Sequence, residues 1–180
     1  MIPDGAVAVT VAVVPLDDDI FENPETVTLE LLADAAYLLG PGTEATVTIA
    51  DDDATTVSIS ATDATAAEPA DNGQFTVSID GGKTSSIDTV ISYTVTGSAT
   101  SGSDFTALGG SVTIPTGSGS AFIDVAVLDD SLLEIDEDVT ITLNAVTGGH
   151  PTITIDAGNN ADTVTISDDD TAQVSIAAND

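Results

Sequence analysis

The sequence predicts an all-β protein made of tandem β-sandwiches of about seven strands each. Two observations lead to this fold class. Short runs alternate between apolar and polar residues, as half-buried strands do, and Gly, Asn, Asp and Ser fill the gaps between the runs. A pattern of about 117 residues also recurs along the chain. Several short strands in a unit of this length, without a helical period, fit two packed sheets.

Gapless alignment of the chain with itself defines the repeat. An offset of 112 residues pairs Leu16–Asp18 with Leu128–Asp130 and aligns residues 1–5 with residues 113–117. A slightly longer loop in the second copy then raises the offset to 117. The recurrence indicates that one structural unit is used more than once.

The repeat divides the chain into three parts. We expect residues 54–170 to form one complete module. Residues 1–53 match the C-terminal half of a preceding module, and residues 171–180 match the first strand of a following one. This organisation suggests an excerpt from a longer array. No signal peptide is visible after Met1, so in a secreted protein the targeting signal would lie elsewhere.

The strands of the complete module are predicted in order from period-two alternation. They are Thr56–Ser60, Gln74–Ile79, Thr89–Thr96, Ser111–Ile114, Ala121–Leu128, Asp138–Val146 and Asp162–Ser167. In the third run we expect Ile91, Tyr93 and Val95 to share one face of the sheet. In the fifth run we expect the same of Ile123, Val125 and Val127.

Only 3% of the residues are aromatic, so the predicted core consists mainly of Val, Ile, Leu and Ala. Phe75, Tyr93, Phe105 and Phe122 are the expected larger fillers. With 42% hydrophobic residues, the chain has enough apolar surface to fold despite its acidity. It contains no Cys, which excludes disulfides and thiolate metal sites.

The charge balance is extreme. The chain has 31 Asp and Glu against a single basic residue of the Lys and Arg type, Lys83, for a formal charge of −30. Nucleic acids and anionic membranes would be repelled, so we expect neither as a partner. No apolar run approaches the ~18 residues that span a bilayer, so membrane insertion is not expected either. A compact body of this charge repels itself, and bound cations are the simplest remedy.

The acidic residues gather in clusters that recur with the repeat. Asp129–Asp138 holds six carboxylates in ten residues, and its near-copy is Asp17–Glu25. A second cluster, Asp51–Asp53, recurs as Asp168–Asp170. Clustered carboxylates repel one another, and a divalent ion turns that repulsion into binding. Oxygen-rich loops of this kind suit Ca²⁺, which takes about six to eight oxygen ligands.

The complete copy resembles the Calx-beta module, a calcium-binding β-sandwich. Four motifs carry the resemblance, in the family's order and spacing: Glu68-Pro69, Gly97–Thr106, Leu128–Glu137 and Ile166–Asp170. The family usually has Tyr where Phe105 stands, a mild departure.

The resemblance implies a calcium cluster at one end of the sandwich. In the complete copy the matching ligand positions are Glu68, Asp104, Asp129, Asp130, the carbonyl of Leu132, Glu134, Glu137, Asp168, Asp169 and Asp170. In the partial copy they are Asp17, Asp18, the carbonyl of Ile20, Glu22, Glu25, Asp51, Asp52 and Asp53. Counterparts of Glu68 and Asp104 would precede Met1, so we expect this site to be incomplete and to bind fewer ions or to bind weakly.

Catalysis is not expected. His150 is the only histidine and lies in a Gly-Gly-His-Pro sequence typical of a turn, which argues against zinc and Ser-His-Asp chemistry. A carboxylate pair of the glycosidase type lacks the aromatic platforms of a sugar cleft.

The leading functional hypothesis is a calcium-dependent structural repeat of a large extracellular or cell-surface protein, expected to be bacterial, that forms a rigid spacer or adhesin-type rod. Calcium between neighbouring modules would fix their angle, and millimolar extracellular calcium suits weak sites. One alternative is a filament or matrix subunit, completed by strands from neighbouring copies in head-to-tail order. The other is a regulatory calcium sensor, with micromolar affinity and a cytosolic context.

Overall fold

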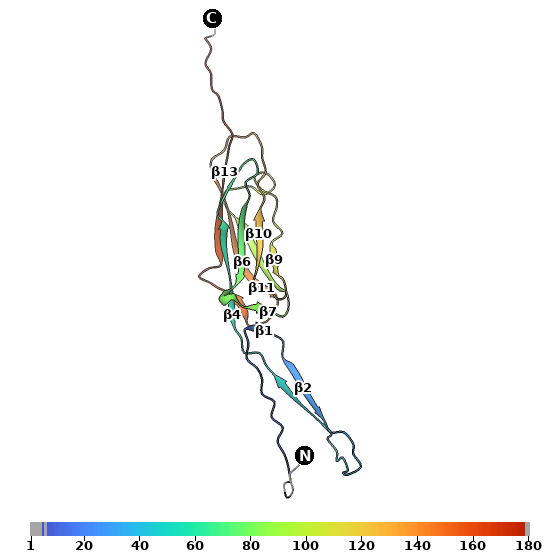
Figure 1. The fold of residues 1–180 in the computed structure, drawn as a ribbon. Helices are drawn as coiled ribbons and strands as arrows, with labels where there is room; N and C mark the ends of the chain where they lie inside the picture. The colour runs from blue at the N-terminus through green and yellow to red at the C-terminus, as the bar shows by residue number, and fades with distance from the viewer. Residues whose placement is uncertain (1–4, 6, 179–180) are drawn as a thin grey trace.

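Two packed sheets form the main body of the chain in the computed structural model, which describes residues 5 and 7–178. One sheet has the strand order β10-β6-β4-β12 and the other β5-β13-β11-β8-β9. The strand bounds are β4 Thr55–Asp63, β5 Thr65–Ala67, β6 Gly73–Ile79, β8 Thr89–Thr96, β9 Ser111–Ile114, β10 Ser120–Val125, β11 Glu137–Gly148, β12 Ile153–Ile155 and β13 Ala161–Ser167. Figure 1 shows the elongated sandwich. In the part of the chain described, no helix is long and apolar enough to cross a membrane.

The predicted strands are present, with small differences at their ends. The runs at Thr89–Thr96 and Ser111–Ile114 match β8 and β9 at both ends. The fifth run ends early, because β10 stops at Val125 and only an isolated bridge joins Val127 to Phe105. The sequence pattern missed β5, β12 and the two-residue strand β7 (Thr84–Ser85), which are too short to show alternation.

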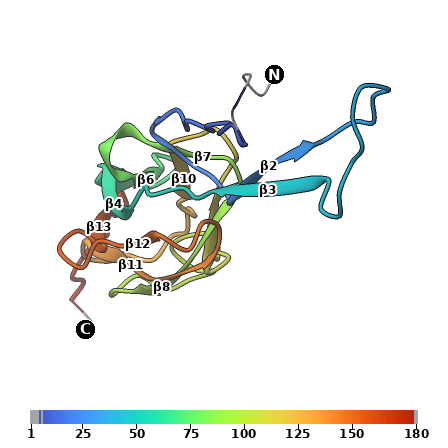
Figure 2. The same cartoon turned by 90° about the horizontal axis from the view of Figure 1, so that it is seen from below.

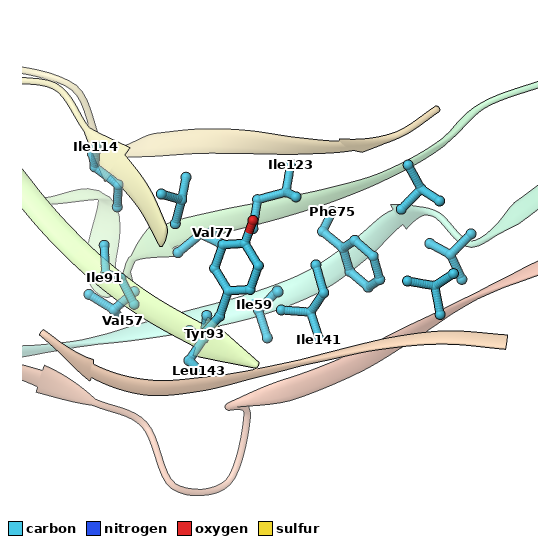
Figure 3. Packing of buried hydrophobic residues seen from close by; sticks show 14 of the residues in the cluster. Val57, Ile59, Phe75, Val77, Ile91, Tyr93, Ile114, Ile123, Ile141 and Leu143 are labelled. Carbon is cyan, nitrogen blue, oxygen red and sulfur yellow. The ribbon is translucent and has the colours of Figure 1, made fainter. Parts of the chain in front are cut away.

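Alternating burial builds the core between the sheets. Along β6, every second residue is buried, from Gly73 to Ile79. Figure 3 shows Phe75 and Tyr93 among the aliphatic side chains of both sheets. Phe105 is also buried, as predicted. Phe122 is not a core residue, contrary to the prediction: it is 61% exposed because its neighbour Ile123 takes the inward position on β10.

The first part of the chain forms a smaller set of strands beneath the sandwich. Strands β2 (Glu25–Glu30) and β3 (Glu44–Ile49) pair as an antiparallel hairpin, which projects away from the sandwich in both views (Figures 1 and 2). Its apolar side chains are half-exposed: Val27 is 42% and Val47 48% exposed. Residues 7–19 form no strand.

Strand β1 (Ile20–Phe21) joins the two parts of the molecule. It pairs in parallel with β7, and Phe21 is fully buried within the hydrophobic core cluster. The Ser86 backbone N–H and hydroxyl both donate to the Phe21 carbonyl oxygen, at 2.9 and 2.8 Å. Phe21 thus attaches the N-terminal part to the lower end of the sandwich.

The C-terminal segment leaves the opposite end of the sandwich (Figure 1). Residues 171–178 pair with no strand in the described structure, and all of them are exposed. The predicted strand at 171–180 therefore stays a prediction, and residues 179 and 180 lie outside the described part. Residues 1–4 and 6 of the predicted half-module also lie outside it.

Candidate metal centre

Carboxylates from four loops meet at the end of the sandwich from which the C-terminal segment leaves. The loops follow β5, β8, β10 and β13, and β11 begins at the same place. Side chains far apart in the sequence become neighbours there because the sheets bring these strand ends together.

Glu68 is placed by strand pairing. Strand β5 runs parallel to the end of β13, with Ala67 opposite Ser167. The Glu68 backbone N–H donates to the Ser167 carbonyl oxygen at 3.0 Å, so Glu68 lies beside the start of the Asp168–Asp170 run. Its side chain is only 7% exposed, although nothing in the charge pattern distinguishes it. The family resemblance was the signal that identified it.

Asp104 is positioned by two anchors. Its neighbour Phe105 is buried in the core, and the Leu128 backbone N–H donates to the Asp104 carbonyl oxygen at 2.9 Å. The Asp104 carboxylate also accepts from the Thr100 backbone N–H, which closes the loop. Asp104 therefore lies next to the Asp129–Asp130 pair and is 6% exposed.

Gly97 allows this loop to lie against the start of β11. Its φ is +134°, and an added Cβ would lie 1.9 Å from the Asp138 carbonyl oxygen. The Ala99 backbone N–H donates to that same oxygen at 3.1 Å, and the Asp138 backbone N–H donates to Ser98 Oγ at 2.9 Å. Only glycine fits this close approach and backbone conformation, so the loop that carries Asp104 is held beside Glu137.

The acidic loop after β10 folds back over the site. Asp130 Oδ1 accepts from the Leu132 backbone N–H at 2.6 Å, and Asp168 Oδ2 accepts from the Glu134 backbone N–H at 2.9 Å. The second bond ties the loop to the end of β13. Of the four predicted acidic ligands between the end of β10 and the start of β11, Asp129 and Asp130 are exposed and Glu134 and Glu137 are partly buried.

Three groups of carboxylates come close enough to share a cation. In each group, one oxygen from every residue lies within 4.8 Å of the others. The groups are Glu68, Asp168 and Asp169; Glu68, Asp130 and Asp170; and Asp104, Glu134 and Glu137. Eight of the predicted positions thus converge, and Glu68 belongs to two groups. Asp129 and Leu132 are in none of the three groups.

Electrostatic repulsion within the groups raises carboxyl pKa values. The pKa of Glu137 rises to about 7, first because its carboxyl hydrogen-bonds to Asp104, then because of burial and the charges of Asp104 and Glu134. Burial, followed by neighbouring carboxylates, raises the pKa of Glu68, of Glu134 and of Asp170. The backbone amide of Asp130 partly opposes the shift at Glu68. The end of the sandwich is therefore short of positive charge.

Two orphaned oxygen atoms show where a cation fits. Glu68 Oε2 and Asp170 Oδ2 are buried and have no hydrogen-bond partner. Both residues belong to the same group with Asp130. Buried carboxylate oxygens without a donor are costly unless a cation neutralises them. An all-oxygen donor set of this kind suits a hard divalent ion such as Ca²⁺ rather than zinc or copper.

The first copy repeats the hydrogen bonds of the acidic end. Asp18 Oδ1 accepts from the Ile20 backbone N–H at 2.9 Å, and Asp51 Oδ2 accepts from the Glu22 backbone N–H at 3.2 Å. These bonds correspond to Asp130–Leu132 and Asp168–Glu134 in the complete copy. The repeat seen in the sequence therefore holds at the level of individual loop contacts.

The first copy's carboxylates are nevertheless more dispersed. They line a pocket of about 420 Å³ formed by Pro15, Leu16, Asp17, Asp18, Ile20, Glu22, Asn23, Glu25, Ile49, Ala50, Asp51, Asp52 and Asp53. In the described residues, no three of these carboxylates approach one another as closely as in the complete copy. The expectation that this site is incomplete stays a prediction.

Two basic side chains from the sandwich face this first acidic site. Lys83 Nζ lies 2.5 Å from Asp53 Oδ1 and 3.2 Å from Asp19 Oδ1. His150 Nε2 lies 3.5 Å from Asp51 Oδ2, and its Nδ1 shares a hydrogen bond with Thr152. His150 lies in a turn, as predicted, but it is only 5% exposed and its ring also faces Phe21. Neither cross-contact has a signal in the sequence.

Comparisons with known proteins agree with this architecture. The Calx-beta domain model matches residues 2–53 and again residues 51–170. Among solved structures, CBD12 from CALX1.2 is 23% identical with a TM-score of 0.52, covering 64% of this chain and 46% of that one. The apo-form Calx CBD1 domain is 22% identical with a TM-score of 0.50, covering 66% of this chain and 100% of that one. At these identities the likeness shows the fold alone.

The chain spans less than half the length of the first of these structures. No curated protein matches it.

Proposed function

Because this chain belongs to the Calx-beta family, we propose that it binds calcium at the acidic end of its complete sandwich, as a structural repeat of an extracellular rod. The observation that carries the proposal is the convergence of eight carboxylates in three groups, with two buried oxygens left without a donor. This arrangement has a binding role and needs no catalytic group.

Calcium would act on the fold by neutralising charge. Asp130 Oδ1 and Asp168 Oδ2 each accept a backbone N–H of the acidic loop, whereas Glu68 Oε2 and Asp170 Oδ2 have no donor and are free to take a cation. A hard cation at this point would tie the loop after β10 to the ends of β5 and β13. A ligand that binds only the folded state adds its binding free energy to stability.

The mechanical role rests on where the site lies. Asp170, a member of one carboxylate group, ends the β13 loop and leads directly into residues 171–178. At the other end, a single residue separates the corresponding Asp53 from β4, and Phe21 is packed into the sandwich. We propose that residues 1–53, 54–170 and 171–180 belong to three successive modules, and that calcium at such junctions makes them rigid.

A thermal-unfolding series tests calcium binding. We expect calcium at 100 times the dissociation constant to add about 2.7 kcal/mol to the free energy of unfolding. That gain is a rise of about 5–10 °C in Tm for a chain of this size. Asp129→Ala with Asp130→Ala should remove most of the gain. The matched control is Asp17→Ala with Asp18→Ala, which changes the same charge in the first copy and should leave most of it.

Equal melting curves in calcium and in chelator would refute calcium binding. If calcium does bind, its dissociation constant distinguishes an extracellular from a cytosolic role: millimolar values support an extracellular spacer, and micromolar values support a regulatory sensor in the cytosol.

A second candidate function is a filament subunit. The hairpin β2–β3 exposes Val27, Leu29 and Val47, whose counterparts Val139, Ile141 and Val164 are buried in the complete copy. Strands from a neighbouring chain would cover this apolar face and the open sheet edges. Small-angle scattering with and without calcium distinguishes the candidates: a monomeric rod supports the spacer, and head-to-tail polymers support the filament.

A further inference from the structure

Lys83 reaches from the sandwich into the acidic site of the first copy. It lies directly before β7, in the loop that follows β6, and it is the chain's single Lys or Arg residue. Its ammonium contacts Asp53 at 2.5 Å and Asp19 at 3.2 Å. The same ammonium lies 5.5 Å from the centre of the Phe21 ring, within cation–π range.

The contact of Lys83 with Asp53 differs from an ordinary surface ion pair, whereas the Asp19 side chain is 83% exposed. The side chains of Lys83 and Asp53 are 22% and 15% exposed, so water screens their interaction only in part. The ammonium also bridges two carboxylates that belong to different loops of the acidic site. It therefore holds these loops together as a bound cation would.

The complete copy provides an internal comparison at the equivalent positions. Asp53 corresponds to Asp170, whose Oδ2 is buried and has no hydrogen-bond partner. Asp19 corresponds to Ser131, so the first copy has one additional carboxylate at this position. The first copy thus has an extra acid, Asp19, and the ammonium of Lys83. The complete copy has neither, and its Asp170 Oδ2 has no hydrogen-bond partner.

We infer that Lys83 is the resident cation of the first acidic site, where its ammonium takes a place that a calcium ion would otherwise occupy at Asp53. The inference rests on the calcium binding proposed above. It implies that the first site binds one calcium ion fewer than it would with a neutral residue at position 83. It also implies that the junction made by Phe21 and β7 holds together in chelator.

Calcium stoichiometry tests the inference on the full chain. Lys83→Met keeps the aliphatic stem over Phe21 and removes the charge. Equilibrium dialysis against calcium should find one more ion bound per chain for this variant than for the wild type. Lys83→Arg keeps the charge and should bind as the wild type does. Adding Asp53→Asn to Lys83→Met should remove the extra ion.

The outcomes separate this inference from the proposed function. A Lys83→Met chain that binds the same number of ions as the wild type, or fewer, overturns the role of Lys83. A gained ion that survives Asp53→Asn also overturns it, because the ion then lies elsewhere. If the wild type binds no calcium, the proposed function is wrong, and the inference that rests on it falls as well. The double variant Asp129→Ala with Asp130→Ala measures calcium binding at the acidic end of the complete sandwich, independently of Lys83.

Discussion

Glu137 and Asp104 share a hydrogen bond between their carboxyl groups, and this bond raises the pKa of Glu137 to about 7. Asp104 lies in the loop after β8 and Glu137 at the start of β11, and the two meet because Gly97 packs against the Asp138 carbonyl oxygen. Below about pH 7, the metal-free site thus holds a proton where a cation would otherwise neutralise the charge. Proton and calcium should compete for the same oxygens.

Calcium binding is therefore expected to release protons. At pH 6, Glu137 is largely protonated in the calcium-free protein, and calcium should displace close to one proton from this residue. At pH 8 it is already ionised, so the release should nearly vanish and the affinity should be higher. Titration calorimetry in two buffers of different ionisation enthalpy measures the release directly. An equal release at both pH values would contradict this assignment.

The same pKa shift sets how the calcium-free protein responds to pH. The folded-state pKa of Glu137 is about 7 and its ordinary value is 4.5, so the folded state binds more protons between these values. Its contribution to stability is therefore full below about pH 4.5 and is lost as the pH rises to about 7. We expect Glu137→Gln to reduce this loss in chelator, measured as Tm at pH 5 and pH 7.5. An unchanged difference between the two Tm values would be inconsistent with the shift.

Glu68 should affect stability with opposite signs in chelator and in calcium. It is buried, has an orphaned Oε2 and belongs to two carboxylate groups. Glu68→Gln removes a buried negative charge, so the calcium-free Tm should rise, whereas the gain on adding calcium should fall by more than half. Asp124→Asn is the control, because it removes a charge on β10 but keeps an oxygen that accepts from Gln74. A loss of Tm for Glu68→Gln in chelator would contradict the prediction.

Local patterns explain why the sandwich was predictable. The alternation in β6 and β8 follows from one face being buried, and this face is visible in the sequence as period two. The acidic clusters were also visible in the sequence, because their members are adjacent residues. The prediction for Phe122 was wrong because a large aromatic residue suggested a core position, whereas in β10 it is the neighbouring Ile123 that points inward.

Long-range contacts explain what the charge pattern alone did not reveal. Glu68 and Asp104 are isolated acids that only the family resemblance identified, and they join the site through the pairing of β5 with β13 and the hydrogen bond from Leu128 to the Asp104 carbonyl oxygen. Lys83 and Phe21 form the lower junction through β1 and β7, each two residues long and too short for a periodic signal. The repeat located corresponding positions, but it contained no information about what faces each copy from outside.

Gly97 is predicted to be essential for the Asp104 carboxylate group. Gly97→Ala would place a Cβ 1.9 Å from the Asp138 carbonyl oxygen at a φ of +134°. The loop must then move away from β11 and separate Asp104 from Glu137. We expect a loss of at least about 1–2 kcal/mol in the free energy of unfolding, together with weaker calcium binding. Gly109→Ala is the matched control, because no atom lies within 4 Å of its Cβ position.

Phe21 should be needed for the attachment of the N-terminal part to the sandwich. Its ring is fully buried and faces His150, while its carbonyl oxygen accepts two hydrogen bonds from Ser86. Phe21→Ala should cost about 3 kcal/mol, the lower end of the range for buried Phe, and should make residues 1–53 more accessible to limited proteolysis. Phe122→Ala removes the same atoms from a side chain that is 61% exposed and should cost much less. If both variants lost equal stability and gave equal cleavage, Phe21 would not be the attachment point, because exposed and buried rings would then contribute alike.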